Sequence, residues 1–266
     1  MTDKKYIIMK IGLALSGGGS KGVAHIGAIK ALEEYGIVST HIAGSSAGAI
    51  VGALYAYGYS WETMLRFFKS VKLLNFTKFA LGKPGFLDAE KYYSEFKTYF
   101  RKDNFEGLQK ELTITATDVL NGKLTIFQEG ELIKPILASA AFPGVFTPVQ
   151  VGNHYYIDGG VLDNFPVTYL TETCDVIIGI HVSGYDVLEI KDLKSTYGVV
   201  ERAFMFKSVQ EDYAKFKHCD IAIAPQELNK YGTFDRGNLD KIFKIGYDAT
   251  KEILTKSELV QAKFQK

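Results

Sequence analysis

The sequence predicts a layered α/β fold, and three observations carry this prediction. Segments with the composition of strands alternate along most of the chain with segments of helical apolar spacing. Two strand-like segments run through glycine-containing turns into helix-like segments, one near Gly17 and one near Ser46. Residues 176–182 are mostly apolar, which is typical of a strand buried in a parallel sheet.

The N-terminal part of the chain predicts two strand-turn-helix units. In the first unit, residues 7–15 form a buried strand, residues 16–22 form a glycine-rich turn, and residues 23–35 have the apolar spacing of a helix. In the second unit, residues 37–43 form a short buried strand. Residues 49–56 are small and apolar, which suits a buried helix.

The pattern in the rest of the chain is mixed. Residues 57–105 are rich in aromatic residues and lysines, and we expect two or three helices there. The other elements that we expect are strands at 112–116, 123–127, 149–157, 176–182 and 221–224, and helices at 199–216 and 239–254.

The composition is that of an ordinary globular protein with one sizeable core. The chain has 266 residues, of which 47% are hydrophobic, and we expect a single domain over residues 1–266. With 31 basic and 30 acidic residues and no dense basic block, nucleic acid is not an expected partner. Cys174 and Cys219 lack the spacing of metal ligands, so we expect reduced core thiols.

The start of the chain has some features of a signal peptide, but we expect it to form the first strand. Lys4 and Lys5 precede an apolar run, but this run leads into the glycine-rich turn without a cleavage site and is better used as the first strand. No stretch is long and apolar enough to span a membrane. We therefore expect a cytoplasmic protein, with peripheral contact at a membrane as an alternative.

Residues 44–48 read Gly-Ser-Ser-Ala-Gly, the Gly-x-Ser-x-Gly pattern of a nucleophile elbow. A serine oxygen on a sharp turn between strand and helix needs small neighbours two positions before and after it, because a side chain there would collide with the flanking backbone. Gly44 and Gly48 remove that collision. The pentapeptide alone is a weak signal. Its place between a predicted strand and a predicted helix makes Ser46 the predicted nucleophile of an acyl hydrolase.

Residues 17–22 read Gly-Gly-Gly-Ser-Lys-Gly and open the first predicted helix. Backbone N–H groups at such a junction can converge on a negative oxygen, either of a phosphate or of a tetrahedral intermediate. The segment also matches the dinucleotide pattern G-x-G-x-x-G, but that fold needs an acidic residue about 20 positions further on, where this chain has none. Because Lys21 is followed by Gly22, the segment is not a P-loop either.

Ser46 needs a base, and the residues alone leave two kinds open. Asp158 follows a predicted strand directly and precedes two glycines, which leave space near its carboxylate. From that tripeptide alone, an aspartate that caps nearby N–H groups in a turn is the favoured interpretation. A histidine triad would use His181, at the end of a predicted strand, or His218, which lies in a charged stretch and is expected at the surface.

Taken together, Gly-Gly-Gly-Ser-Lys-Gly at 17–22, Gly-Ser-Ser-Ala-Gly at 44–48 and Asp-Gly-Gly at 158–160 resemble the three signatures of the patatin-like phospholipase family, in its bacterial single-domain form. The resemblance covers about residues 8–182. Further stretches that carry it are 115–118, 121–123, 138–149 and 163–167. The part from about 189 to 266, which we expect to be helical, contains no motif of this family.

The resemblance implies a three-layer α/β/α fold with a mainly parallel central sheet, related to the acyl-carrier-protein transacylase fold. It also implies a Ser-Asp dyad, with Ser46 as the nucleophile and Asp158 as the base, and oxyanion donors at Gly17, Gly18 and Gly19. The substrate implied is a lipid or acyl ester, and no metal or organic cofactor is implied. An acyltransferase with the same nucleophile and a catalytically silent lipid-binding protein are the alternatives.

The aromatic residues that follow the elbow have two interpretations. Tyr55, Trp61, Phe67, Phe68, Phe76 and Phe79 are among those interleaved with lysines, which would suit a surface touching lipid. We favour simple packing of helices on the sheet, because globular domains commonly bury aromatics at this density. The hypothesis that we keep is that this region caps an acyl pocket.

Overall fold

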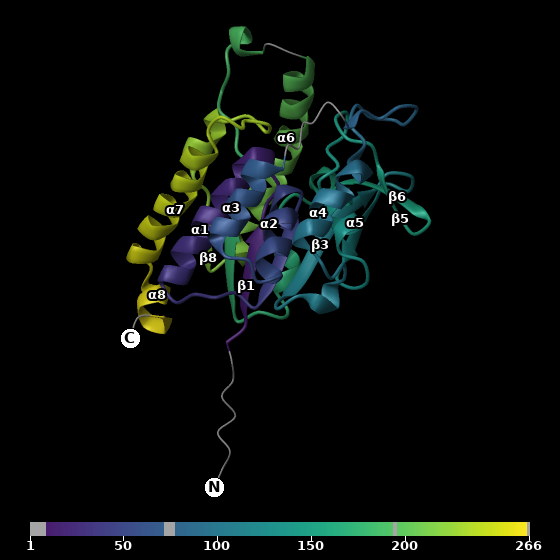
Figure 1. The fold of residues 1–266 in the computed structure, drawn as a ribbon. Helices are drawn as coiled ribbons and strands as arrows, with labels where there is room; N and C mark the ends of the chain where they lie inside the picture. Colours follow the sequence, from purple (N-terminus) through teal and green to yellow (C-terminus); the bar gives the residue numbers. More distant parts are fainter. Residues whose placement is uncertain (1–8, 72–77, 194–195, 265–266) are drawn as a thin grey trace.

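The computed structural model describes residues 9–71, 78–193 and 196–264. Its described residues form an eight-stranded sheet, in which β5-β6-β3-β2-β1-β7-β8 lie in this order and β4 pairs with β3 (Figure 1). The parallel strands are β1 (Ile11–Leu15), β2 (His41–Ser45), β3 (Glu111–Asp118), β7 (Val176–Ile180) and β8 (Ile221–Ile223). The antiparallel additions are β4 (Lys123–Phe127), β5 (Val149–Val151) and β6 (His154–Asp158).

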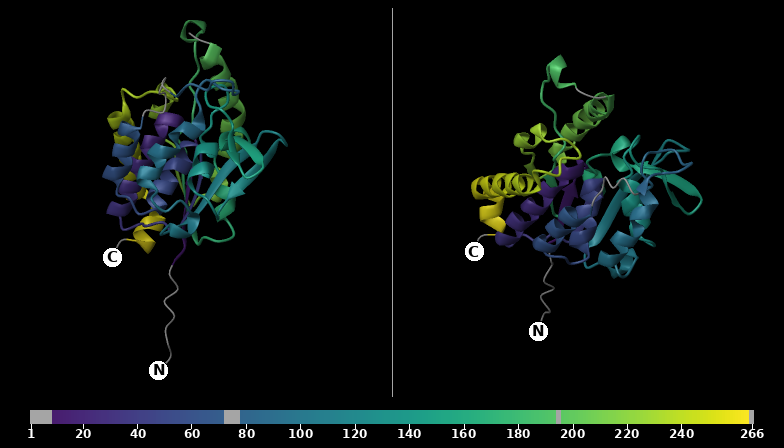
Figure 2. Two further views of the ribbon diagram at one scale, coloured as in Figure 1. Left: turned by 45° about the vertical axis from the view of Figure 1, so that its right-hand side comes forward. Right: turned by 45° about the horizontal axis from the view of Figure 1, so that its top comes forward.

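Helices cover the sheet, as the alternating pattern predicts. The N-terminal units supply α1 (Val23–Glu34), α2 (Ala47–Ala56) and α3 (Trp61–Ser70); α4 (Tyr93–Tyr99) and α5 (Ile133–Ser139) lie near β3 (Figure 1). The C-terminal part supplies α6 (Thr196–Ala214), α7 (Leu239–Lys256) and α8 (Glu258–Lys263). Helix α7 packs along α1, and both views in Figure 2 keep them side by side. No helix of the described residues is both long enough and apolar enough to cross a membrane.

The opposite face of the central strands carries a smaller apolar cluster. Phe165 and the short 3-10 helix η6 (Val167–Leu170) pack there against Ala14 and Ala43, with Cys174 and Cys219 at the edge. Both cysteines are free thiols. The sheet is therefore covered on both faces, and the predicted mainly parallel α/β fold is confirmed.

Three strand predictions were wrong in detail. Of the strand predicted at residues 7–15, residues 7 and 8 lie outside the described residues, and β1 begins only at Ile11. The second strand occupies His41–Ser45 rather than residues 37–43. Ile37 is buried, but its N–H bonds the carbonyl of Leu32 at the end of α1, so its apolar side chain belongs to the helix end rather than to the sheet. Residues 149–157 are not one strand but the hairpin of β5 and β6, because Gly152 turns the chain with φ 59°.

The register of β3 brings two strand ends together. Ser45, the last residue of β2, pairs with Thr115, while Asp158, the last residue of β6, pairs with Ala116. These two partners are neighbours on β3. The residue that follows β2 therefore lies next to the end of β6, although the two are far apart in the sequence.

Candidate active site

Ser46 occupies the sharp turn between β2 and α2. Its backbone has φ 52° and ψ −120°, and Ser46 is the one non-glycine residue with positive φ in the described part of the chain. Such a conformation costs of order 1–3 kcal/mol and persists only when the surroundings impose it. The flanking glycines permit it: a Cβ on Gly44 would lie 2.6 Å from the Gly48 carbonyl carbon, and one on Gly48 would lie 2.2 Å from the Leu15 oxygen. The predicted elbow geometry is present.

The Ser46 hydroxyl donates a hydrogen bond to Asp158 Oδ2 over 2.7 Å. The other carboxylate oxygen, Oδ1, accepts the N–H of Gly160 over 2.8 Å, so Asp158 also caps the turn that follows it. The interpretation of Asp158 as a turn-capping aspartate is therefore confirmed, and its role as the base of Ser46 stays a prediction. Asp158 is 2% exposed, and this burial raises the pKa of its carboxyl to about 6, against the two hydrogen bonds that favour the charged form.

The glycine-rich turn lies beside this pair, and some of its N–H groups already donate hydrogen bonds to carbonyl groups of the protein. The N–H of Gly17 donates to the Asn164 carbonyl over 3.1 Å, so it is not directed at a substrate in this structure. The N–H of Ser20 donates to the Thr233 carbonyl over 2.7 Å. Gly18 and Gly19, which both line the cavity described below, are left as the donors of this loop that could face an oxyanion.

The N–H of Ser46 itself is also occupied. It donates to Ser139 Oγ over 2.9 Å, and Ser139 lies at the buried end of α5. This contact holds the strained elbow from the end of α5. Ser139 was not singled out from the sequence, although it lies in the stretch 138–149 that carries the family resemblance; a lone serine in a helix gives no local sign of such a role.

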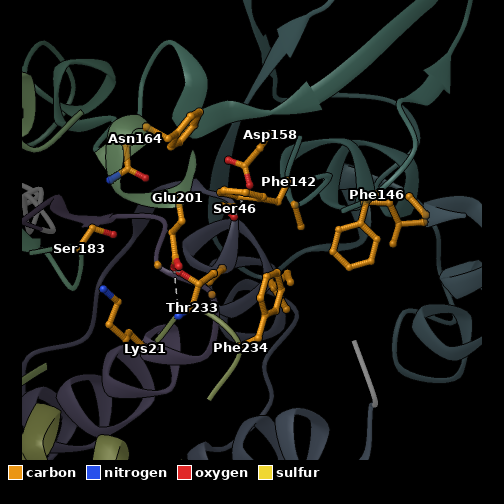
Figure 3. A pocket seen from close by; sticks show the side chains of 18 of the residues that line it. Lys21, Ser46, Phe142, Phe146, Asp158, Asn164, Ser183, Glu201, Thr233 and Phe234 are labelled. Carbon is orange, nitrogen blue, oxygen red and sulfur yellow. Dashed lines mark hydrogen bonds between the residues drawn. The ribbon is translucent and has the colours of Figure 1, made fainter. Parts of the chain in front are cut away.

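A cavity opens at Ser46 and Asp158, and it has a polar side and an apolar side. Figure 3 shows Asp158 turned toward Ser46, with Asn164 and Ser183 on one side and Phe146 and Phe234 on the other. The other apolar residues that line the cavity include Ile50, Phe68, Tyr92, Phe96, Leu137, Phe142, Phe204 and Met205. An apolar cavity with a few polar groups beside a nucleophile suits a substrate with a hydrocarbon chain.

Helices α3 and α4 contribute to this apolar wall. Phe68 and Phe96 are buried and line the cavity, and the favoured interpretation of the aromatic region as packing is confirmed for them. Phe79 is exposed, whereas Phe76 lies outside the described residues. The region after the elbow thus supplies part of the wall, in agreement with the hypothesis that it caps the pocket.

The polar side of the cavity contains residues that the sequence analysis did not assign to it. Lys21 is buried, and desolvation lowers the pKa of its ammonium group to about 8, with Glu201 and Asp186 opposing the shift. Glu201 accepts hydrogen bonds from the N–H and hydroxyl of Thr233. Because the Thr233 carbonyl accepts the N–H of Ser20, these bonds hold the C-terminal part of the chain against the glycine-rich turn. Neither Glu201 nor Thr233 lies in a motif, so no sequence signal pointed to them.

The histidines that could form a triad lie elsewhere. His181 is buried and bonds Asp212, and His218 is exposed, as expected. His25 bonds the Ser16 carbonyl, and burial lowers the pKa of its imidazole to about 4. Within residues 9–71, 78–193 and 196–264, no histidine lines the cavity or bonds Ser46. The same residues contain no group of three or more His, Cys, Asp or Glu side chains placed to hold a metal ion.

Comparison with known proteins gives a consistent result. The family described as "Patatin-like phospholipase" matches residues 13–171, more than half of the chain. An uncharacterized NTE family protein of Mycobacterium tuberculosis is 35% identical over 187 residues, which cover 69% of this chain and 52% of that protein. Lysophospholipase nte1 of Emericella nidulans is 27% identical over 277 residues, which cover 92% of this chain and 18% of that protein. The chain spans about half the length of the mycobacterial relative.

A solved structure supports the fold. VipD from Legionella pneumophila matches with a TM-score of 0.55 and 15% identity, over 93% of this chain and 66% of that one. At this identity the likeness concerns the fold alone.

Proposed function

The chain belongs to the patatin-like phospholipase family, and from this premise we propose that it is a serine acyl hydrolase that cleaves a fatty-acyl ester of a lipid. The observation that carries the proposal is the hydrogen bond of 2.7 Å from Ser46 Oγ to Asp158 Oδ2. It joins a hydroxyl on a strained elbow to a buried carboxylate, at the mouth of an apolar cavity. This is the arrangement of a nucleophile beside its base.

In the first half of the proposed reaction, Ser46 Oγ attacks the ester carbonyl carbon while Asp158 Oδ2 takes the hydroxyl proton. The carbonyl oxygen becomes an oxyanion, and the N–H groups of Gly18 and Gly19 donate to it. When the C–O bond of the ester breaks, the proton passes from Asp158 to the leaving alkoxide. The products of this half are the free alcohol and an acyl group on Ser46.

The second half repeats the same steps with water. Asp158 takes a proton from a water molecule while the water oxygen attacks the carbonyl carbon of the acyl-serine. When the bond between this carbon and Ser46 Oγ breaks, Asp158 returns the proton to Ser46 Oγ and the fatty acid is released. Burial supports this role, because a carboxyl with a pKa of about 6 is a stronger base than an exposed aspartate and is still mostly ionised at pH 7. No histidine is needed as an intermediary.

The apolar wall supports a lipid as the substrate class. The side chains opposite the polar residues are aromatic and aliphatic, and they come from five helices, α2, α3, α4, α5 and α6, among other segments. The relative from Emericella nidulans is named a lysophospholipase, which supports testing single-chain phospholipids first.

The experiment that tests the proposal is fatty-acid release from a panel of lysophospholipids, diacyl phospholipids and neutral esters, by the native protein and by Ser46→Ala. We expect release by the native protein and none above background by the variant. Ser45→Ala is the matched control, because Ser45 is the adjacent, fully buried serine at the end of β2. Acyl transfer to an added alcohol in place of release would favour the acyltransferase alternative. Binding without turnover would favour the silent lipid-binding protein.

A further inference from the structure

The segment 163–165 is held from the C-terminal part of the chain at three consecutive residues. Lys215 Nζ, just after α6, bonds Asp163 Oδ1 over 2.6 Å and the Phe165 carbonyl over 3.2 Å. Between them, Asn164 Nδ2 donates to Asp212 Oδ2 over 2.7 Å. The segment directly follows the turn that contains Asp158, so it connects the dyad to α6.

Asp212 is a buried acid that accepts two hydrogen bonds on one carboxylate oxygen, Oδ2. It is 1% exposed on the last turn of α6, and its Oδ2 also bonds His181 Nε2 over 2.9 Å. Lys215 Nζ lies 4.0 Å from the other oxygen, Oδ1. A buried carboxylate needs such partners, because an unpaired one is strongly disfavoured in a low-dielectric interior. The bond from His181 Nε2 fixes Asp212 Oδ2, and therefore the Asn164 amide that bonds the same oxygen.

This contact determines which way the Asn164 side chain points. An amide oxygen against the Asp212 carboxylate would be repulsive, so the Nδ2 group faces Asp212 and Oδ1 faces the opposite side. A Cβ built on Gly17 would lie 2.4 Å from Asn164 Oδ1 and 3.1 Å from Ser46 Cβ. The amide oxygen of Asn164 therefore lies beside the glycine-rich turn and the elbow, where it lines the cavity.

The backbone of Asn164 holds the glycine-rich turn at the same place. Its carbonyl accepts the N–H of Gly17 over 3.1 Å, one residue before Gly18 and two before Gly19. A shift of Asn164 would move this turn relative to Ser46. In catalysis a misplacement of about 1 Å in a positioning contact can lower the rate by about 10²-fold.

We propose that Asp212 is a positioning residue of the active site: it fixes Asn164, which in turn fixes the glycine-rich turn against Ser46. The proposal rests on the proposed function, since it assigns Asp212 a part in the same reaction. It also assigns a role at the site to the C-terminal part, which lacks a family motif: this part would position the glycine-rich turn. Asp212 touches neither substrate nor the reacting atoms and acts through Asn164.

The test compares Asp212→Ala, Asp212→Asn and the control Glu211→Gln, which changes an exposed acid on the same helix. A fluorophosphonate first titrates the reactive serines, so that kcat with a soluble p-nitrophenyl ester is expressed per competent site. For Asp212→Ala we expect kcat per site to fall about 10- to 100-fold with a smaller change in KM. An asparagine can still accept from Asn164 Nδ2, so Asp212→Asn is expected within about threefold of the native protein.

Hydrogen exchange gives a reading that does not depend on turnover. We expect the amides of residues 16–22 to exchange faster in Asp212→Ala than in the native protein and in Glu211→Gln. Unchanged kcat per site together with unchanged exchange would overturn the proposal, and so would an equal loss in Glu211→Gln. If the native protein released no product, the proposed function would fail, and the exchange comparison alone would decide the positioning role. If Asp212→Ala does not fold, Asn164→Ala cuts the same link and is expected to give the same changes.

Discussion

Two buried acidic residues, Asp158 at the site and Asp212 behind it, differ in their place in the fold and in the chemistry of their donors. Asp158 comes from the end of a strand in the motif-bearing part, and its donors are a serine hydroxyl and one backbone N–H. Asp212 comes from α6, and its neighbours are an amide, an imidazole and an ammonium group. Each carboxylate accepts two hydrogen bonds, but only Asp158 accepts one from the hydroxyl of Ser46. This difference is what the two proposals require, a base at Asp158 and a positioning residue at Asp212.

The same contrast extends to the regions that carry them. Ser46, Asp158 and the glycine-rich turn are placed by backbone geometry: sheet register, an elbow and a helix start. The C-terminal part reaches the site through the Thr233 carbonyl, which accepts the N–H of Ser20, and otherwise through side chains, among them Glu201, Phe204 and Asp212. The chemistry can therefore be encoded in short motifs, whereas the walls and supports of the site depend on contacts that no motif records.

Of the changes that test the proposed difference between Asp158 and Asp212, we expect removal of the Asp158 charge to have the largest effect. In Asp158→Asn the hydroxyl of Ser46 keeps an acceptor but loses its base, so we expect kcat/KM to fall about 10²–10⁴-fold. The measurement is hydrolysis of a soluble ester, with Asp175→Asn, an exposed acid beside β7, as the control. An Asp158→Asn variant with native turnover would mean that another group accepts the proton.

The pH profile tests the same acid without a substitution. The base must be ionised to take the proton, and the pKa of Asp158 is raised to about 6 by burial. We expect kcat/KM to be constant above about pH 7 and to fall about tenfold per pH unit below about 6, reaching about 100-fold at pH 4. A profile that stays flat down to pH 4 would contradict the assignment of the buried carboxylate.

We expect Asp158→Asn to raise the stability of the protein although it lowers its activity. The pKa of Asp158 rises from 3.8 to about 6 on folding, so folding favours the neutral acid. That stabilisation is complete below about pH 4 and is lost as the pH rises through 6. A permanently neutral asparagine should therefore raise the free energy of unfolding by about 2–3 kcal/mol at pH 8 and by almost nothing at pH 4. Thermal unfolding at both pH values measures this, and a loss of stability at pH 8 would contradict it.

The contribution of the apolar wall to substrate binding can be measured separately from the catalytic step by comparing alanine variants of two phenylalanines on α6. Phe204 lines the cavity and packs against Phe142 with ring centroids 5.4 Å apart, whereas Phe206, two residues on, is exposed. We expect Phe204→Ala to lower kcat/KM for a long-chain ester about tenfold and to leave an acetyl ester nearly unchanged, because only the long chain reaches the wall. Phe206→Ala should change neither, and equal losses in the two variants would argue against this wall.

Peripheral contact with a membrane stays a prediction, and we expect it to have the smallest effect. Leu81 is 90% and Phe86 is 70% exposed on the loop whose backbone pairs with the segment around the cavity residue Phe146. Replacing both with Glu should lower activity on substrate in vesicles a few-fold and leave activity on a soluble ester unchanged. Leu120→Glu, at 67% exposure after β3, is the control. Equal effects of the two changes, or none, would count against membrane contact through this loop.

Much of this architecture follows from local sequence, and the rest does not for identifiable reasons. Residues 44–48 predict the elbow because the collision that the glycines avoid is local, and residues 123–127 predict β4 within its observed bounds. The wrong bounds of β2 arose because the buried Ile37 looks the same whether it packs on a helix end or in a sheet. The 149–158 hairpin was missed although its Gly-Asn turn was visible at 152–153.

The site shows the same division between local and distant information. Ser46 and Asp158 could be proposed together only through the family resemblance, since the residues alone left histidine bases open. Ser139, Asn164 and Asp212 lie 93, 118 and 166 positions from Ser46, and their bonds form only once the sheet has assembled. The single domain over residues 1–266 remains a prediction.

The most direct test of the central claim is to map the adduct that a fluorophosphonate leaves on the native protein, by mass spectrometry of its peptides. The account predicts one adduct per chain, on Ser46, unchanged in Ser45→Ala, absent in Ser46→Ala and formed much more slowly in Asp158→Asn. An adduct on any other residue, or labelling that proceeds equally fast without the Asp158 carboxylate, would contradict the claim that Ser46 is a nucleophile activated by Asp158.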